Sequence, residues 1–146
     1  QQGCLMIRLF YTCLIGALTL APAHAQQTPP PAALTLELNA LQASDTACRV
    51  SFLATNGLDG TIDRAAVEVA FFTTDGAIDR IVTLDFKGLT QGKTKVLQFE
   101  LADLPCTGIG RLLINDIAAC EGQAIAATAC LAGLVTTSRP DITFGI

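Results

Sequence analysis

Cysteine is the residue type whose number and spacing most directly indicate chemistry in this chain. The 146-residue sequence has six cysteines, and four of them follow the N-terminal region: Cys48, Cys106, Cys120 and Cys130. An even number of cysteines in a small exported domain is typical of a disulfide framework. Three pairings are available. We favour Cys120–Cys130, which closes a short local loop, together with Cys48–Cys106, which links two distant parts of the domain.

Metal binding and thiol redox catalysis are both disfavoured by the spacing. No Cys-x-x-Cys pair occurs, and the only histidine, His24, lies in the N-terminal region, whereas zinc sites and thioredoxin-like sites depend on such residues. A second group of ligand-type residues is the repeated frame Asp-Gly-x-Ile-Asp-Arg at 59–64 and 75–80. Its four carboxylates fall short of the six to eight oxygens that Ca²⁺ needs. We interpret the two frames as turns that lead into strands, and the sequence predicts no metal and no cofactor.

The usual catalytic residues are also missing beyond residue 25. Serines and threonines occur there, but no histidine is present to activate one, and no Gly-x-Ser-x-Gly turn is found. Trp and Tyr, on which sugar rings commonly stack, are absent from the same region. The sequence therefore predicts a protein that is not an enzyme. A carboxylate-dependent hydrolase stays open as an alternative, and it would need Asp103, Asp116 and Glu121 to cluster in one pocket with a raised pKa.

Residues 1–25 have the pattern of upstream sequence followed by a cleaved signal peptide. Arg8 gives a positive start, residues 9–20 form an apolar run too short to span a bilayer, and Ala23-His24-Ala25 matches a signal peptidase site. We expect cleavage after Ala25 and a periplasmic location in a Gram-negative bacterium. Retention of the leader as an anchor is the alternative.

The remaining chain reads as a short lead-in and one domain. Residues 26–33 (QQTPPPAA) form a proline-bearing lead-in, and residues 34–146 form the domain. The chain has a net charge of −4 at pH 7 without a Lys/Arg cluster, which argues against nucleic acid and anionic membranes as partners. No apolar stretch after residue 25 approaches the ~20 residues of a membrane helix, so we expect no membrane insertion of the mature chain.

Alternation of apolar and polar residues predicts an all-β domain. Five segments each have one apolar face with a period of two residues: 34–40, 48–54, 67–71, 82–86 and 97–101. Asn56-Gly57 and Asp75-Gly76 tolerate the positive φ of tight turns, and Arg111–Ile117 suits a strand covered on both faces. Residues 121–131 predict a short helix or turn before a last strand at 134–139. About seven strands indicate a two-sheet sandwich of immunoglobulin or fibronectin type, with a small barrel as the alternative.

Recognition through a surface is the function that remains. Leu53, Ala66, Phe72 and Ile81 are apolar residues at expected outward positions, where a contiguous group would mark a contact surface. The competing interpretation is that packing of the sandwich covers both faces. An edge strand at Leu34–Ala40 would offer a second route, pairing with a partner strand. We predict a periplasmic, non-catalytic binding or accessory module of an envelope complex, with another envelope protein as partner. A small secreted hydrolase inhibitor is the alternative, and the oligomeric state is left open.

Five runs of the domain carry a family resemblance: LTLELNAL (34–41), CRVSFLATNG (48–57), VTLDFKGL (82–89), QFELADLPC (98–106) and RLLINDIAAC (111–120). They resemble a group of small exported proteins of alphaproteobacterial type that have no assigned activity. The resemblance covers nearly the whole domain. It implies a periplasmic location and a disulfide-bonded β-domain, and it implies no activity.

Overall fold

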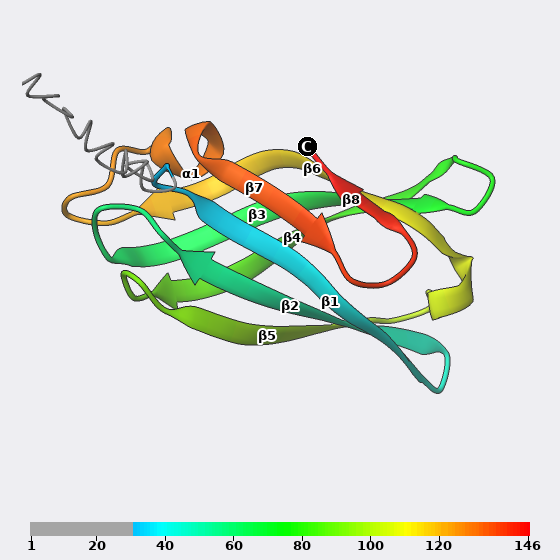
Figure 1. Cartoon of the computed structure of the whole chain (residues 1–146). Helices are drawn as coiled ribbons and strands as arrows, with labels where there is room; N and C mark the ends of the chain where they lie inside the picture. Colours follow the sequence, from blue (N-terminus) through cyan, green and yellow to red (C-terminus); the bar gives the residue numbers. More distant parts are fainter. Residues whose placement is uncertain (1–30) are drawn as a thin grey trace, which may run out of the picture.

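The computed structural model describes residues 31–146, so the expected signal peptide and most of the lead-in lie outside the described residues. Eight strands, one turn of 3-10 helix and one short α-helix make up the domain (Figure 1). In chain order they are β1 (Leu34–Ser44), β2 (Ala47–Asn56), β3 (Ile62–Thr73), β4 (Ile78–Leu89), β5 (Thr94–Leu101), η1 (Cys106–Gly108), β6 (Ile109–Glu121), α1 (Ala129–Ala132), β7 (Leu134–Ser138) and β8 (Thr143–Gly145).

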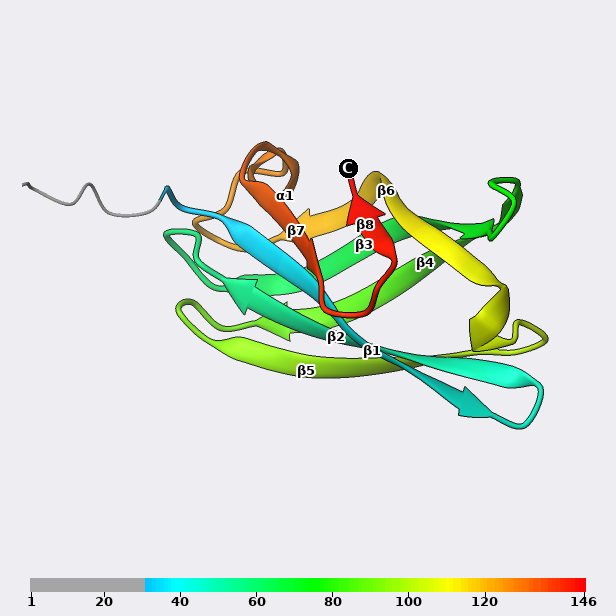
Figure 2. The same cartoon turned by 45° about the vertical axis from the view of Figure 1, so that its right-hand side comes forward.

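The strands form two four-stranded sheets, with the orders β5-β2-β1-β7 and β4-β3-β6-β8. The two sheets face each other across the core (Figure 2). The prediction of an all-β, two-sheet sandwich is therefore confirmed. The sequence analysis did not find β8, because three residues are too few to show a period. This strand is placed by its parallel pairing with β6, in which Arg111 is opposite Thr143 and Leu113 is opposite Gly145.

The prediction that the strand Leu34–Ala40 lies at a sheet edge is wrong. This segment belongs to β1, which pairs antiparallel with β2 on one side and parallel with β7 on the other. The chain returns from the far end of the sequence to cover this edge, and local alternation carries no sign of such a long-range pairing. The outer strands of the described sheets are β5, β7, β4 and β8.

The core lies between the sheets and is built from the alternating apolar residues that the sequence shows. Phe52 lies near its centre, with its ring edge-on to Phe86, Phe99 and Phe144 at centroid distances of 5.7, 6.0 and 5.5 Å. Such edge-to-face contacts stabilise aromatic pairs beyond the area they bury. The three partners come from β4, β5 and β8, so this aromatic cluster connects β2 to strands of both sheets.

Two disulfides brace the sandwich, and they follow the pairing favoured from the sequence. Cys48 of β2 is bonded to Cys106 at the start of η1, and Cys120 of β6 is bonded to Cys130 of α1. The first bond ties one sheet to the connection that leads into the other sheet. The second closes the segment that follows β6. On the chain-entropy model the two closures contribute roughly 4 and roughly 3 kcal/mol, respectively.

The turns use their glycines in two different ways. Gly76 has a φ of 91° in the β3–β4 hairpin, as Asp75-Gly76 predicts. The hydroxyl of Thr73 donates to the Asp75 carboxylate there, and this bond lowers the pKa of Asp75. Asn56-Gly57 does not adopt the left-handed conformation. Gly57 is needed for close approach, since a Cβ at this position would lie 2.7 Å from the carbonyl oxygen of Ala33.

Candidate interaction site

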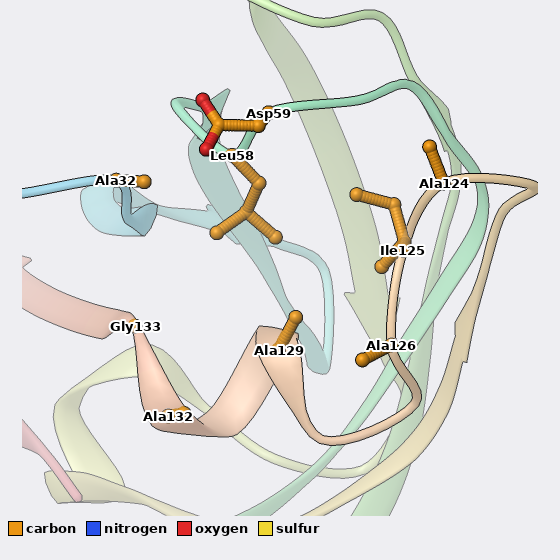
Figure 3. A pocket seen from close by; sticks show the side chains of 9 residues that line it. All are labelled: Ala32, Leu58, Asp59, Ala124, Ile125, Ala126, Ala129, Ala132 and Gly133. Carbon is orange, nitrogen blue, oxygen red and sulfur yellow. The ribbon is translucent and has the colours of Figure 1, made fainter.

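One end of the sandwich is hollowed where several loops meet. The β2–β3 loop, the segment between β6 and α1, α1 itself and the residues before β1 converge there (Figure 1). They border an open hollow of about 420 Å³, which we call the loop-end hollow (Figure 3). Its lining residues are Ala32, Leu58, Asp59, Ala124, Ile125, Ala126, Ala129, Ala132 and Gly133.

The lining of the loop-end hollow is apolar and made mainly of small residues. Leu58 is 6% exposed and belongs to the core, and Ile125 packs against that core. The five alanines leave space that longer side chains would fill. Asp59 is the one charged residue among the nine that line the hollow. An apolar concavity with few polar groups is the common form of a ligand or side-chain pocket.

Asn56 fixes the loop that carries Leu58 and Asp59. Its side chain is fully buried. The Nδ2 atom donates to the carbonyl oxygens of Gly60 at 2.8 Å and Leu89 at 2.9 Å. The Oδ1 atom accepts a hydrogen bond from the backbone N of Leu58 at 3.0 Å. Its backbone N–H donates to Lys93 at 3.1 Å. One side chain therefore joins the β2–β3 loop to the end of β4. From the sequence, Asn56 was interpreted only as a turn residue, because nothing local shows that it is buried.

The opposite wall is held by the Cys120–Cys130 disulfide. The bond closes the segment from β6 to α1, in which the backbone N of Ala129 donates to the Ala126 carbonyl at 2.9 Å. Leu131, the next residue of α1, has 48% of its surface exposed. The wall is thus a covalently closed loop, and the residue that directly follows it presents a large apolar side chain to solvent.

The four residues expected to form one surface are divided between the two sheets. Leu53 is half-buried in the β5-β2-β1-β7 sheet, whereas the other three lie in the other sheet. Ala66 and Phe72 are buried, and Phe72 is covered by the Arg111 guanidinium, whose carbon lies 4.0 Å from the ring centroid. Only Ile81, at 52%, is strongly exposed. The expectation treated consecutive strands as neighbours, but β2 and β3 belong to different sheets.

A different apolar surface does exist on the outside of the β4-β3-β6-β8 sheet. It contains Phe72 and Ile81 with three residues that sequence analysis did not select, and we call it the outer patch: Ala70, Phe72, Ile78, Ile81 and Leu113. None of the five belongs to the cluster between the sheets, so they lie on the outward face; there Ile78 and Ile81 are exposed, Leu113 is half-buried, and Ala70 and Phe72 are buried. Ile78 is 61% exposed, whereas Ile62, at the same place in the first Asp-Gly-x-Ile-Asp-Arg frame, is fully buried. Arg111–Ile117, expected to be covered on both faces, is likewise open on this side.

The carboxylates required by a hydrolase are spread over the domain. Asp103 lies in the connection after β5. Asp116 and Glu121 are both in β6, five residues and therefore about 16 Å apart along the strand. Glu121 contacts Arg64 at 3.5 Å. Within residues 31–146 no group of three or more His, Cys, Asp or Glu is arranged to hold a metal ion. The cluster on which that hypothesis depends is not formed.

No helix in the part of the chain that the structure describes is both long and apolar enough to cross a bilayer.

Comparison with known proteins gives a fold and no family. No family model and no curated protein matches the sequence. Among solved structures, IrmA from Escherichia coli is similar to this chain, with a TM-score of 0.55 and 10% sequence identity. The similarity covers 71% of this chain and 90% of IrmA. At this identity it concerns the fold alone.

Proposed function

We propose that this chain is an exported, non-catalytic binding module of an envelope protein complex, and that it binds its partner at the loop-end hollow. The observation that carries this proposal is the hollow itself, an apolar concavity of about 420 Å³ whose walls are fixed by a disulfide and by the buried Asn56. A rigid concavity loses little conformational entropy when it binds, which favours recognition.

Export is supported by the disulfides, by the N-terminal residues and by the resemblance to exported proteins. Disulfides persist in oxidising compartments such as the periplasm, and this domain has two of them. The N-terminal residues match a signal peptide, and the resemblance to exported alphaproteobacterial proteins points the same way. A periplasmic location also places the domain beside envelope proteins.

The lining suggests what the partner presents. Alanine walls around Leu58 and Ile125 fit one or two apolar side chains. Asp59 at the same site favours a Lys or Arg next to them, since opposite charges at a rim steer and orient association. The partner is therefore a protein that presents an apolar side chain beside a basic one.

A small hydrolase inhibitor is the second candidate, and one observation favours it. The disulfide-closed segment between Cys120 and Cys130 leads directly to the exposed Leu131. A large exposed side chain held directly beside a disulfide-closed loop is a form of contact that a protease or other hydrolase cleft accepts. The identity of the captured partner separates the two candidates.

Two neighbouring alanines provide a matched test by affinity capture from the native envelope. Both alanines are exposed, but only Ala126 lines the hollow, and Ala127 is not part of the lining. We expect Ala126→Glu to abolish capture of the recurrent partner, because the longer side chain would fill the hollow and its carboxylate would be desolvated against the partner's apolar side chain. Ala127→Glu adds the same charge to the same loop and should leave capture unchanged. Equal capture by both variants would contradict binding at the hollow.

A further inference from the structure

We propose that the outer patch binds a second copy of this chain, and that two copies form a dimer with the β4-β3-β6-β8 sheets face to face. This surface is separate from the loop-end hollow. Phe72 and Ile78 flank the β3–β4 hairpin, whereas the hollow adjoins the opposite end of β3 (Figure 2). Dimerisation would therefore leave the hollow free.

The register of the strands arranges the outer patch in rows. Ile78, Phe72 and Arg111 are paired across β4, β3 and β6 and make the first row. Ile81, Ala70 and Leu113 are paired in the same way and make the second row. Ile78 and Ile81 of β4 are exposed, Leu113 of β6 is half-buried, and Phe72 and Ala70 between them are buried. Single exposed apolar side chains are normal, but neighbouring ones that continue into an apolar sheet face are typical of an interface.

Charged residues at the two ends of the outer patch indicate that its partner is a second copy of this chain. Arg111 is in the first row. Beyond the second row, Glu68 and Asp116 are paired across β3 and β6 and belong to a third row. Among residues 31–146 none of these three side chains takes part in an ion pair, although Glu68 accepts a hydrogen bond from Asn115 at 3.1 Å. A cation at one end and two anions at the other make the surface complementary to itself.

A two-fold axis that runs along the second row satisfies this complementarity. It places Ile81 and Leu113 against the same residues of the second copy, and Arg111 against the Glu68–Asp116 pair of the second copy. The interface is isologous, as in most homodimers, so each charge contact occurs twice. Face-to-face sheets pack about 10 Å apart, a separation that an arginine side chain and a carboxylate from the other side can bridge.

The free edge of β4 is protected against a partner strand, whereas the outer face of its sheet can accept a partner sheet. The ammonium of Lys95 donates to the carbonyl oxygens of Phe86 at 3.3 Å and Gly88 at 3.1 Å. At the other end, Arg80 donates from β4 to the Ala102 carbonyl at 2.8 Å. Lysine at an edge is a common protection against strand addition. Association through the face remains available.

Sedimentation velocity of the purified, disulfide-bonded protein tests this proposal. We expect a dimer at micromolar concentrations, and we expect Ile81→Asp to weaken dimerisation at least about tenfold because the carboxylate meets its own copy at the centre of the interface. Val96→Asp is the matched control. Val96 is 64% exposed on the outside of the other sheet, so this variant should dimerise like the unmodified protein.

Charge reversal gives a second readout that misfolding does not imitate. Arg111→Glu alone and Glu68→Arg with Asp116→Arg should each weaken self-association, whereas an equimolar mixture of the two variants should form the mixed dimer. A monomer at all concentrations would overturn the proposal. It would also be overturned by equal weakening in Ile81→Asp and Val96→Asp, or by a mixture that stays monomeric. None of these results depends on the loop-end hollow or on its partner.

Discussion

Replacement of Cys48 and Cys106 together by alanine is expected to lower the free energy of unfolding by roughly 4 kcal/mol, more than loss of the other disulfide. The two residues are 58 positions apart in the sequence, so their bond removes much conformational freedom from the unfolded chain. In the folded state the bond joins β2 to the start of η1, where the chain passes from one sheet to the other. Cys48 is fully buried, so its loss also leaves a small cavity.

Urea unfolding of oxidised protein measures this effect, and the second disulfide supplies the control. Cys120→Ala with Cys130→Ala removes a bond between residues only 10 positions apart, so we expect a smaller loss of roughly 3 kcal/mol. Each double variant keeps the other disulfide, which rules out mispairing as a cause of the difference. A larger loss from the shorter loop would contradict the account of the Cys48–Cys106 bond as the principal brace.

Asn56→Ala is expected to cost about 3 kcal/mol or more in the free energy of unfolding. The substitution leaves the carbonyl oxygens of Gly60 and Leu89 and the backbone N of Leu58 without their side-chain partner. All three residues are buried, and each buried polar group left unpaired costs about 1–3 kcal/mol. The same groups set the β2–β3 loop, so we also expect faster amide exchange at Leu58.

Asn39→Ala is the control for this substitution. Asn39 also donates a side-chain hydrogen bond, to Glu37 at 2.7 Å, but it is only partly buried. Its replacement should change the free energy of unfolding by no more than about 0.5–1 kcal/mol, as expected for a site near the surface. Similar losses at the two asparagines would show that the Asn56 side chain does not organise the loop.

Those features of the fold that depend on local pattern were predictable. Alternation located five of the eight strands in the described residues, two more were expected at 111–117 and 134–139, and Asp75-Gly76 located the β3–β4 hairpin. Pairing between distant segments was not predictable in this way. The position of β1 in the middle of its sheet depends on β7, and β8 depends on three residues that pair with β6. Neither contact leaves a periodic signal in the residues that make it.

The candidate site was less accessible to sequence reasoning than the fold. The loop-end hollow is lined by alanines from separate segments, and an alanine has no chemistry that a motif search detects. Asn56 looked like a turn residue because its burial depends on β4. The outer patch was found in part, through Phe72 and Ile81. Ile78 was missed because the two frames each begin a strand, and nothing in the repeated residues shows that Ile62 is buried whereas Ile78 is exposed.

Site-specific photo-crosslinking in the native envelope tests the central claim, that the loop-end hollow is the contact with a partner protein. A photoreactive amino acid in place of Ala132, which lines the hollow, is compared with the same amino acid in place of Ala127, which does not. We predict one recurrent cross-linked protein from position 132 and none from position 127. Cross-links of equal yield from both positions, or none from position 132 while the tagged protein still captures a partner, would contradict the account.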